Sequence, residues 1–190
     1  MWEREPTRIL EIMDPGTYQG ELGESGSHLW RNVNQVHIVN GHVEKHDANF
    51  VGGLSFDQIG HTNIYIGNYP QVEDDAQALH EAGVTGIFNV QTDTDIEHRG
   101  YNWDLMKQYY SERGMEAIHF PITDFNHDDL LNKLFDGACK INHMVSNGQK
   151  VFVHCTAGMG RAPACVLAYL CLFKKVDCWH NPGEVDHWVR

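Results

Sequence analysis

The sequence predicts an α/β fold, with helices flanking a central, mostly parallel sheet. The main observation is that short apolar strands alternate with amphipathic helices from about residue 60 onward. A second is the chain length of 190 residues, which suits one domain with an appended segment. Ligands of such sheets bind at the carboxyl ends of the strands, so we look for chemistry there.

Four segments are predicted to be strands because they are short, rich in apolar residues and bounded by polar or glycine residues. The segment 84–90 is apolar enough to be buried, and 150–154 is a compact run that includes two valines. The predicted strands are 63–67, 84–90, 116–120 and 150–154.

Four further segments are predicted to be helices. The first begins with acidic residues and ends at Gly83, which matches the usual helix start and stop signals. In the third, apolar side chains recur at helical spacing, and Gly148 follows its end. The fourth is almost entirely apolar, so we expect it to be buried. The predicted helices are 74–83, 104–113, 130–147 and 163–173.

Residues 1–54 differ from the rest, being rich in Gly, Asn, His and Glu with weak periodicity. We interpret them as an N-terminal extension, either β-rich or irregular, and residues 55–190 as the main folded domain. The N-terminus lacks the order of charged and apolar residues that marks a signal peptide. We therefore expect a cytoplasmic location.

Composition disfavours several functions. The formal net charge of −12 argues against broad binding to nucleic acid or to an anionic membrane. The five cysteines form no CxxC pair, and the thirteen histidines are scattered, so we expect neither a metal site nor a disulfide framework. No cofactor is expected.

The segment 154–161, His-Cys-Thr-Ala-Gly-Met-Gly-Arg, is the most specific feature of the sequence. It joins a predicted strand to a predicted helix, and Gly158 and Gly160 allow the backbone to turn its N–H groups inward. Such a loop at a helix N-terminus binds anions. Arg161 adds a planar fork that suits two phosphate oxygens. The segment therefore predicts a phosphate-binding loop made of His154, Thr156, Ala157, Gly158, Met159 and Gly160 around Cys155.

Cys155 is predicted to be the nucleophile. The groups that bind phosphate also stabilise a thiolate, which can attack a bound phosphorus atom in line. The product is a phosphocysteine that water hydrolyses. Taken alone, Cys155 could be a buried structural cysteine, but an arginine six residues later makes the catalytic reading much more specific. We expect His154 to support the loop by hydrogen bonding.

A general acid must protonate the departing alkoxide, and Asp124 is the candidate because it follows the strand 116–120 in a loop. Asp128 and Asp129 are rivals, but they fit the first turn of the next helix, where acids are common.

These residues resemble the dual-specificity phosphatases of the protein tyrosine phosphatase superfamily, whose signature is His-Cys-x5-Arg. The string CxAGxGR at 155–161 is similar to the glucan phosphatases, a group with laforin-like and plant starch-excess members. The segments 88–96 and 123–125 also resemble that group, and the resemblance covers about residues 60–180. It implies a tyrosine phosphatase-like fold whose catalytic domain is shortened at the C-terminal end.

The resemblance also implies a glucan channel lined by aromatic residues, for which Phe125, Tyr101 and Trp103 are the candidates. Tyr101 and Trp103 could equally be core or helix-start residues. In residues 1–54, Gly20-Glu21-Leu22 weakly resembles a carbohydrate-binding module, of which only a remnant would be present. Many relatives carry Ser or Thr where this chain has Ala162, so hydrolysis of the intermediate could be slower.

Three functions remain open. The first is a phosphatase acting on phosphate monoesters of starch or glycogen, favoured because the loop has no lysine to hold a polyanionic substrate. The second is a dual-specificity phosphatase acting on phosphoproteins. The third is a weakly active glucan-binding scaffold. The sequence does not decide the oligomeric state.

Overall fold

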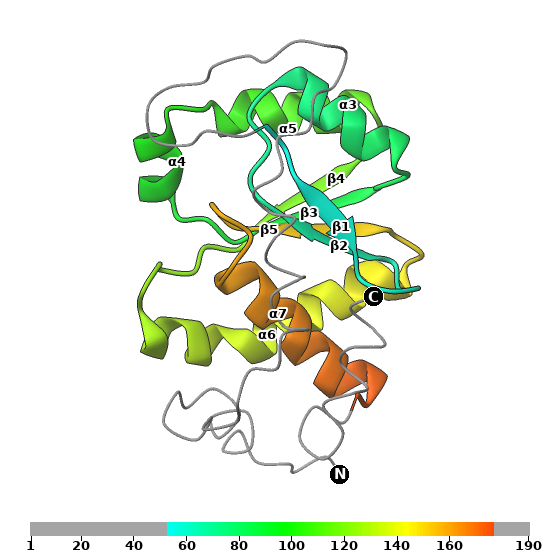
Figure 1. Cartoon of the computed structure of the whole chain (residues 1–190), viewed down its shortest axis with the longest axis vertical. Helices are drawn as coiled ribbons and strands as arrows, with labels where there is room; N and C mark the ends of the chain where they lie inside the picture. Colours follow the sequence, from blue (N-terminus) through cyan, green and yellow to red (C-terminus); the bar gives the residue numbers. More distant parts are fainter. Residues whose placement is uncertain (1–52, 177–190) are drawn as a thin grey trace, which may run out of the picture.

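The computed structural model describes residues 53–176, which form a sheet between two layers of helices (Figure 1). The predicted α/β fold is confirmed. The expectations for residues 1–52, including the carbohydrate-binding remnant, and for the C-terminal end beyond residue 176 lie outside the described residues. Among residues 53–176, no helix is long and apolar enough to cross a bilayer.

The sheet has five strands in the order β1-β2-β5-β3-β4. All neighbouring pairs are parallel except β1 with β2, which is antiparallel. The last residue of β5 lies opposite Gly67 on one side and Asn89 on the other, so these strands end at the same edge. The strands are β1 (Phe56–Gln58), β2 (Ile64–Gly67), β3 (Gly86–Asn89), β4 (Glu116–His119) and β5 (Val151–His154).

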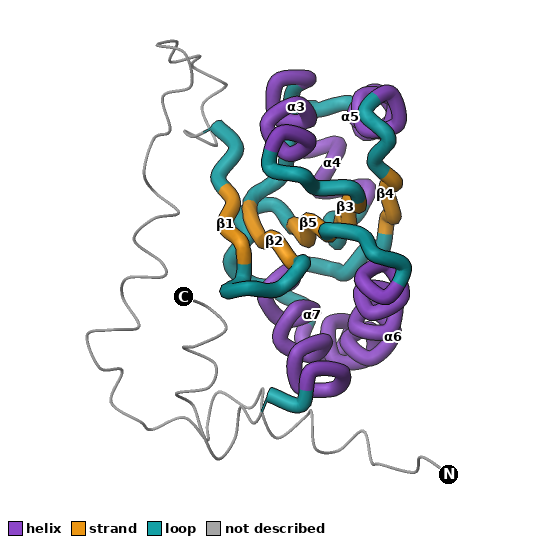
Figure 2. Tube along the Cα trace, turned by 90° about the vertical axis from the view of Figure 1, so that its right-hand side faces the viewer, coloured by secondary structure: helices purple, strands orange, loops and turns teal. Residues whose placement is uncertain are grey.

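The helices cover both faces of the sheet (Figures 1 and 2). On one side lie α3 (Glu73–Glu81), α4 (Asp93–Arg99) and α5 (Trp103–Glu112). On the other lie α6 (His127–Ser146) and α7 (Arg161–Tyr169), which continues into the π-helix η2 (Leu170–Lys174). Each face has its own apolar core. One is centred on Leu79, Ile87 and Tyr110, and the other on Phe88, Ile141 and Val153.

The boundaries of α6 and α7 differ from the predicted ones. The α6 helix begins three residues earlier than expected because Asn126 accepts a hydrogen bond from the Asp129 N–H at 3.0 Å. The α7 helix begins at Arg161, not at residue 163, so the arginine belongs to the first turn. Its regular part ends at Tyr169, and the remaining residues form the π-helix.

Two elements were not predicted. The strand β1 is only three residues long and lies at the edge of the sheet. The α4 helix has seven residues and no buried side chain, so it lacks an apolar stripe that would reveal it in the sequence. Its start is fixed by reciprocal capping between Thr92 and Asp95, and its end by Gly100 with φ 68°.

Candidate active site

The loop 155–160 lies at the centre of the strand ends, because β5 is the middle strand of the sheet. Cys155 follows β5 directly and is 3% exposed. Gly158 has φ 73°, and a Cβ there would lie 2.6 Å from the carbonyl carbon and oxygen of Gly67. The loop thus packs against the end of β2 so closely that position 158 has no room for a side chain.

Arg161 is held on one edge of its guanidinium by the protein. Its Nη1 donates to Asp95 Oδ2 at 2.6 Å and to the Ile122 carbonyl at 2.8 Å. The side chain is 4% exposed, so these bonds are made in a largely dry environment. Asp95 was not among the predicted site residues.

The other edge of the guanidinium, formed by Nε and Nη2, makes longer contacts with the protein. Nη2 lies 3.1 Å from Asp124 Oδ2 and 3.4 Å from Thr156 Oγ1. Among the described residues, the buried Nε has no hydrogen-bond partner. Buried donors are normally paired. An unpaired Nε beside Nη2 is therefore the edge that a phosphate would bind with two of its oxygens.

Asp95 is ionised at neutral pH. Burial raises the pKa of its carboxyl, but hydrogen bonds from Arg161 and Thr92 outweigh burial and hold the pKa below its usual value. The arginine is therefore paired with a carboxylate that stays charged.

Asp124 lies in the loop between β4 and α6, where the sequence predicted it, and contacts Arg161. Its side chain is 42% exposed, which leaves it open to a leaving group arriving from solvent. The rival Asp129 has a different role. It accepts a hydrogen bond from the Thr123 N–H at 2.7 Å and pairs with Lys133.

These contacts make Asp129 a poor proton donor. The hydrogen bond from Lys133, together with those from Thr123, lowers the pKa of Asp129 to about 2. Asp128, the other rival, is exposed in the first turn of α6. The geometry therefore favours Asp124 as the general acid.

His154 is fully buried and stacks on Phe152 with ring centroids 5.3 Å apart. Burial lowers the pKa of its imidazole to about 3, so the ring is neutral. Its Nδ1 lies 3.4 Å from the Cys155 carbonyl, to which it can donate a long hydrogen bond. This arrangement suits a supporting role for the loop.

A hydrogen-bonded chain that was not predicted from the sequence connects the loop with the segment between α4 and α5. Gln91, which is fully buried, donates to Thr156 Oγ1 at 3.0 Å and accepts from the Tyr101 hydroxyl at 2.6 Å. Its carbonyl also lies 2.7 Å from His119 Nε2. A glutamine directly after a buried strand was the available signal, since polar residues at strand ends often face a site.

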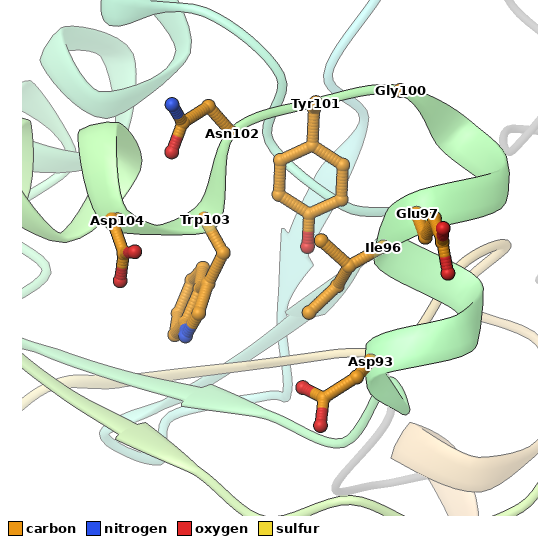
Figure 3. Close-up of a pocket in the computed structure, with 8 residues that line it drawn as sticks. All are labelled: Asp93, Ile96, Glu97, Gly100, Tyr101, Asn102, Trp103 and Asp104. Carbon is orange, nitrogen blue, oxygen red and sulfur yellow. The ribbon is translucent and has the colours of Figure 1, made fainter.

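A shallow pocket of about 650 Å³ lies between α4 and the start of α5 (Figure 3). Two of the predicted glucan-binding residues, Tyr101 and Trp103, line it. Trp103 also packs against Tyr110 and His119, with ring centroids 6.1 and 5.8 Å away. The full lining is Asp93, Ile96, Glu97, Gly100, Tyr101, Asn102, Trp103 and Asp104.

The third candidate, Phe125, lies elsewhere, in the loop that carries Asp124. Its side chain is fully exposed, and its backbone has φ 55°, a left-handed conformation that is uncommon for a residue with a Cβ. Met159, in the phosphate-binding loop, is also exposed. The structure therefore places the candidates in two groups, Tyr101 and Trp103 in the pocket and Phe125 beside the acid.

The arrangement can perform phosphoryl transfer to sulfur. A phosphate held by Arg161 would lie at the mouth of the loop that contains Cys155, with Asp124 able to protonate the leaving oxygen. Cys165 is not an alternative nucleophile, because burial raises the pKa of its thiol to about 12. Within residues 53–176, no group of three or more His, Cys, Asp or Glu side chains is placed to hold a metal ion.

Comparison with known proteins shows the family to which the chain belongs. Residues 64–179 match the family described as "Dual specificity phosphatase, catalytic domain", and the chain belongs to that family. Laforin of Mus musculus is 33% identical over 142 residues, which are 66% of this chain and 43% of laforin. The phosphoglucan phosphatase LSF1, chloroplastic, of Arabidopsis thaliana is 35% identical over 107 residues, covering 56% of this chain and 18% of that protein.

A third relative, the phosphoglucan phosphatase DSP4, amyloplastic, of Castanea sativa, is 33% identical over 112 residues. These cover 57% of this chain and 29% of the relative, so this chain spans less than half the length of all three proteins. The resemblance to the glucan phosphatase branch is thus supported by similarity across more than half of the chain.

Solved structures support the fold. The crystal structure of Tk-PTP in the active form aligns with a TM-score of 0.56 at 22% identity, covering 70% of this chain and 84% of that one. The crystal structure of PTPMT1 aligns with a TM-score of 0.51 at 22% identity, covering 70% and 80%. The predicted tyrosine phosphatase-like fold is therefore confirmed.

Proposed function

We propose that this protein is a cysteine-dependent phosphatase that hydrolyses phosphate monoesters on a glucan such as starch or glycogen. The main observation in favour of phosphatase chemistry is that the protein holds only one edge of the Arg161 guanidinium. One edge is fixed by Asp95 and Ile122, while Nη2 contacts Thr156 in the loop of Cys155 and the acid Asp124, and Nε has no hydrogen-bond partner among the described residues. Laforin and the two plant relatives, named phosphoglucan phosphatases, support the choice of substrate.

The charge around the site favours a sparse phosphate on a neutral polymer. Asp93, Glu97 and Asp104 line the pocket, and the phosphate-binding loop contains no lysine. A second phosphate on the same substrate would meet these carboxylates and be repelled. Sugar hydroxyls can instead donate hydrogen bonds to the carboxylates, and sugar rings can pack on aromatic faces.

Two aromatic surfaces are available to a sugar chain. Phe125 exposes its whole side chain next to the acid. Trp103 and the ring of Tyr101 border the pocket, although the Tyr101 hydroxyl is already bonded to Gln91. We propose that a glucan contacts Phe125 near the reacting phosphate, and that the pocket holds a more distant part of the chain.

A cytoplasmic location stays a prediction. Cys139, Cys155 and Cys165 are free thiols, which suits a reducing compartment. Two relatives are described as chloroplastic and amyloplastic, so an organelle of this kind is the alternative.

The test is phosphate release from solubilised amylopectin and from para-nitrophenyl phosphate, measured in parallel with Cys155→Ser as the blank. Release from both, with phosphate-free glucan inhibiting the amylopectin reaction, supports the proposal. Release from the small ester alone would indicate a different substrate, with phosphoprotein the leading alternative. Release from neither, by a folded protein, would favour the glucan-binding scaffold.

The aromatic contacts need their own controls. Phe125→Ala and Trp103→Ala should each lower kcat/KM for amylopectin by about fivefold to thirtyfold, the loss expected for one or two kcal/mol of stacking. The same variants should change the small-ester reaction less than twofold. Phe135→Ala is the matched control, because Phe135 is an exposed aromatic residue on α6 outside the pocket lining.

A further inference from the structure

Asp95 makes the shortest contact to Arg161, the phosphate clamp, yet it lies on a helix that contributes no side chain to the core. We propose that Asp95 is a positioning residue that fixes the guanidinium of Arg161 for two-point binding of phosphate. The inference rests on the proposed phosphatase chemistry but not on the glucan substrate.

The geometry fixes the arginine from two sides. Nη1 donates to Asp95 Oδ2 on α4 and to the Ile122 carbonyl in the loop after β4. These two acceptors come from different segments, and both use the same nitrogen. The guanidinium is planar, so fixing Nη1 in this way sets the plane in which Nε and Nη2 point. Those two nitrogens are the ones left for the ligand.

Asp95 is itself held rigidly. Its Oδ2 also accepts from the Thr92 N–H and the Thr92 hydroxyl, each at 2.9 Å. Thr92 in turn accepts from the Asp95 N–H at 3.1 Å, which completes the cap of α4. A carboxylate locked by its own helix start is a better anchor than one on a freely rotating side chain.

Asp95 also restrains the competition between Asp124 and the phosphate. Asp124 lies 3.1 Å from Nη2, the edge that the phosphate needs. Without Asp95, Nη1 keeps only the neutral Ile122 carbonyl among the bonds observed here, and the guanidinium can turn toward Asp124. Asp124 would then be drawn away from the leaving group, and the fork would no longer match the phosphate.

Two effects of Asp95 oppose each other, and geometry decides between them. The negative charge of Asp95 weakens the pull of Arg161 on an anion, so its removal could strengthen simple ion pairing. However, a misplacement of about 1 Å in a catalytic group can cost a hundredfold in rate. We therefore expect a net loss when Asp95 is removed.

The experiment compares Asp95→Ala with Thr92→Ala and with Asp75→Ala, using para-nitrophenyl phosphate and inhibition by inorganic phosphate. Thr92→Ala removes the hydroxyl that caps α4, but the Asp95 carboxylate still accepts from the backbone N–H of residue 92 and from Arg161. Asp75 is the matched control, because it occupies the same capping position on α3, where its carboxylate accepts from Gln71 and Val72.

Asp95→Ala should lower kcat/KM about tenfold to a hundredfold and weaken phosphate inhibition by a comparable factor. Thr92→Ala and Asp75→Ala should lower the melting temperature but keep the inhibition constant within about threefold. Asp95→Asn should be intermediate, because its amide oxygen still accepts from Arg161 without the charge.

Two results would overturn the inference. One is a folded Asp95→Ala protein with an unchanged inhibition constant for phosphate. The other is a Thr92→Ala protein that loses phosphate affinity as much as Asp95→Ala, because capping would then explain both. If the wild type does not hydrolyse the ester, the proposed function fails, and calorimetric binding of inorganic phosphate to the same variants still decides the role of Asp95.

Discussion

At the scale of single residues, some polar atoms of the site bond to the protein and others are left for the substrate. The guanidinium of Arg161 gives Nη1 to the protein and leaves Nε without a protein partner among the described residues. His154 is kept neutral by burial, and Asp95 is kept ionised by its hydrogen bonds. The carboxylate that anchors Arg161 therefore keeps its charge, whereas the imidazole next to Cys155 in the sequence is uncharged.

Replacing the nucleophile should separate chemistry from folding. Cys155→Ser exchanges sulfur for oxygen in a buried position, so the free energy of unfolding should change by about 1 kcal/mol or less. Phosphate release should fall by at least about a thousandfold, because a serine hydroxyl is not ionised by this loop. Phosphate release and thermal unfolding on the same sample test this, and a near-normal rate would rule out the phosphocysteine mechanism.

The role of Asp124 should depend on the leaving group. Asp124→Asn keeps an oxygen near Arg161 but cannot donate the proton, so hydrolysis of an alkyl phosphate should slow by about a hundredfold or more. An ester of nitrophenol should slow less, because its leaving group needs little protonation. The measurement is the ratio of kcat/KM for the two esters. Asp128→Asn is the control, and an unchanged ratio in Asp124→Asn would move the acid elsewhere.

At the scale of elements, the phosphate-binding loop depends on its contact with the end of β2. Gly158→Ala places a Cβ 2.6 Å from Gly67 backbone atoms, at a position with φ 73°. Backbone cannot move aside as a flexible side chain could. We expect a loss of about 2–4 kcal/mol in unfolding free energy, or a displaced loop with little activity.

Gly114→Ala is the matched control for that substitution. Gly114 has φ 70°, but a Cβ there meets nothing within 4 Å, so only the cost of the backbone conformation, about 1 kcal/mol, remains. Denaturant unfolding of both variants, with activity on a small ester, measures the difference. Equal losses would mean that the contact with Gly67 contributes nothing.

The elements with their own periodicity were predictable from the sequence. The helices α3, α5, α6 and α7 and the four parallel strands each carry an apolar pattern, and their boundaries differ from the predicted ones by a few residues, at α6 because Asn126 caps its start. The α4 helix carries no such pattern, because it is held by its cap and by one bond to Arg161. The edge strand β1 depends on pairing with β2, and a three-residue segment is too short to show a strand pattern in the sequence.

In the site, too, residues that follow a local sequence pattern were predictable and residues brought in from distant segments were not. Cys155 and Arg161 lie six residues apart, at the two ends of one short segment, so their spacing alone indicates a phosphate site. Asp95 and Gln91 contact that loop from positions 66 and 65 residues away in the chain. Such contacts depend on the strand order and on where α4 begins, and neither can be predicted from a local sequence pattern. Sequence reasoning therefore predicted Cys155 and Arg161 but missed Asp95, which contacts Arg161, and Gln91, which contacts Thr156.

At the scale of the whole molecule, buried His154 should make stability depend on pH. Its imidazole has a pKa of about 3 in the folded state and about 6.5 in an unfolded chain. Below pH 6.5 the unfolded state therefore binds a proton that the folded state does not. Stability should be complete above pH 6.5 and should fall by up to about 1.4 kcal/mol per pH unit as the pH drops toward 3.

Urea unfolding at several values between pH 7.5 and 4.5 isolates this effect, because the depressed pKa values of Asp95 and Asp129 matter mainly below about pH 4. His154→Asn should flatten the dependence, whatever it does to stability at pH 7. A variant with the same slope as the wild type would show that His154 is not the group responsible.

The central position of β5 has a consequence for how the protein is made. The strand that ends at the nucleophile is the last of the described strands in the chain, yet it pairs with β2 and β3 on either side. On the ribosome, β2, β3 and β4 emerge first, and the gap between β2 and β3 stays unfilled until residues 151–154 appear. Closure of that gap joins segments 87 residues apart, as in the pairing of Ile64 with Val151, so it should be a late and slow step of folding. The phosphate-binding loop around Cys155, which follows β5, is therefore assembled only after this step.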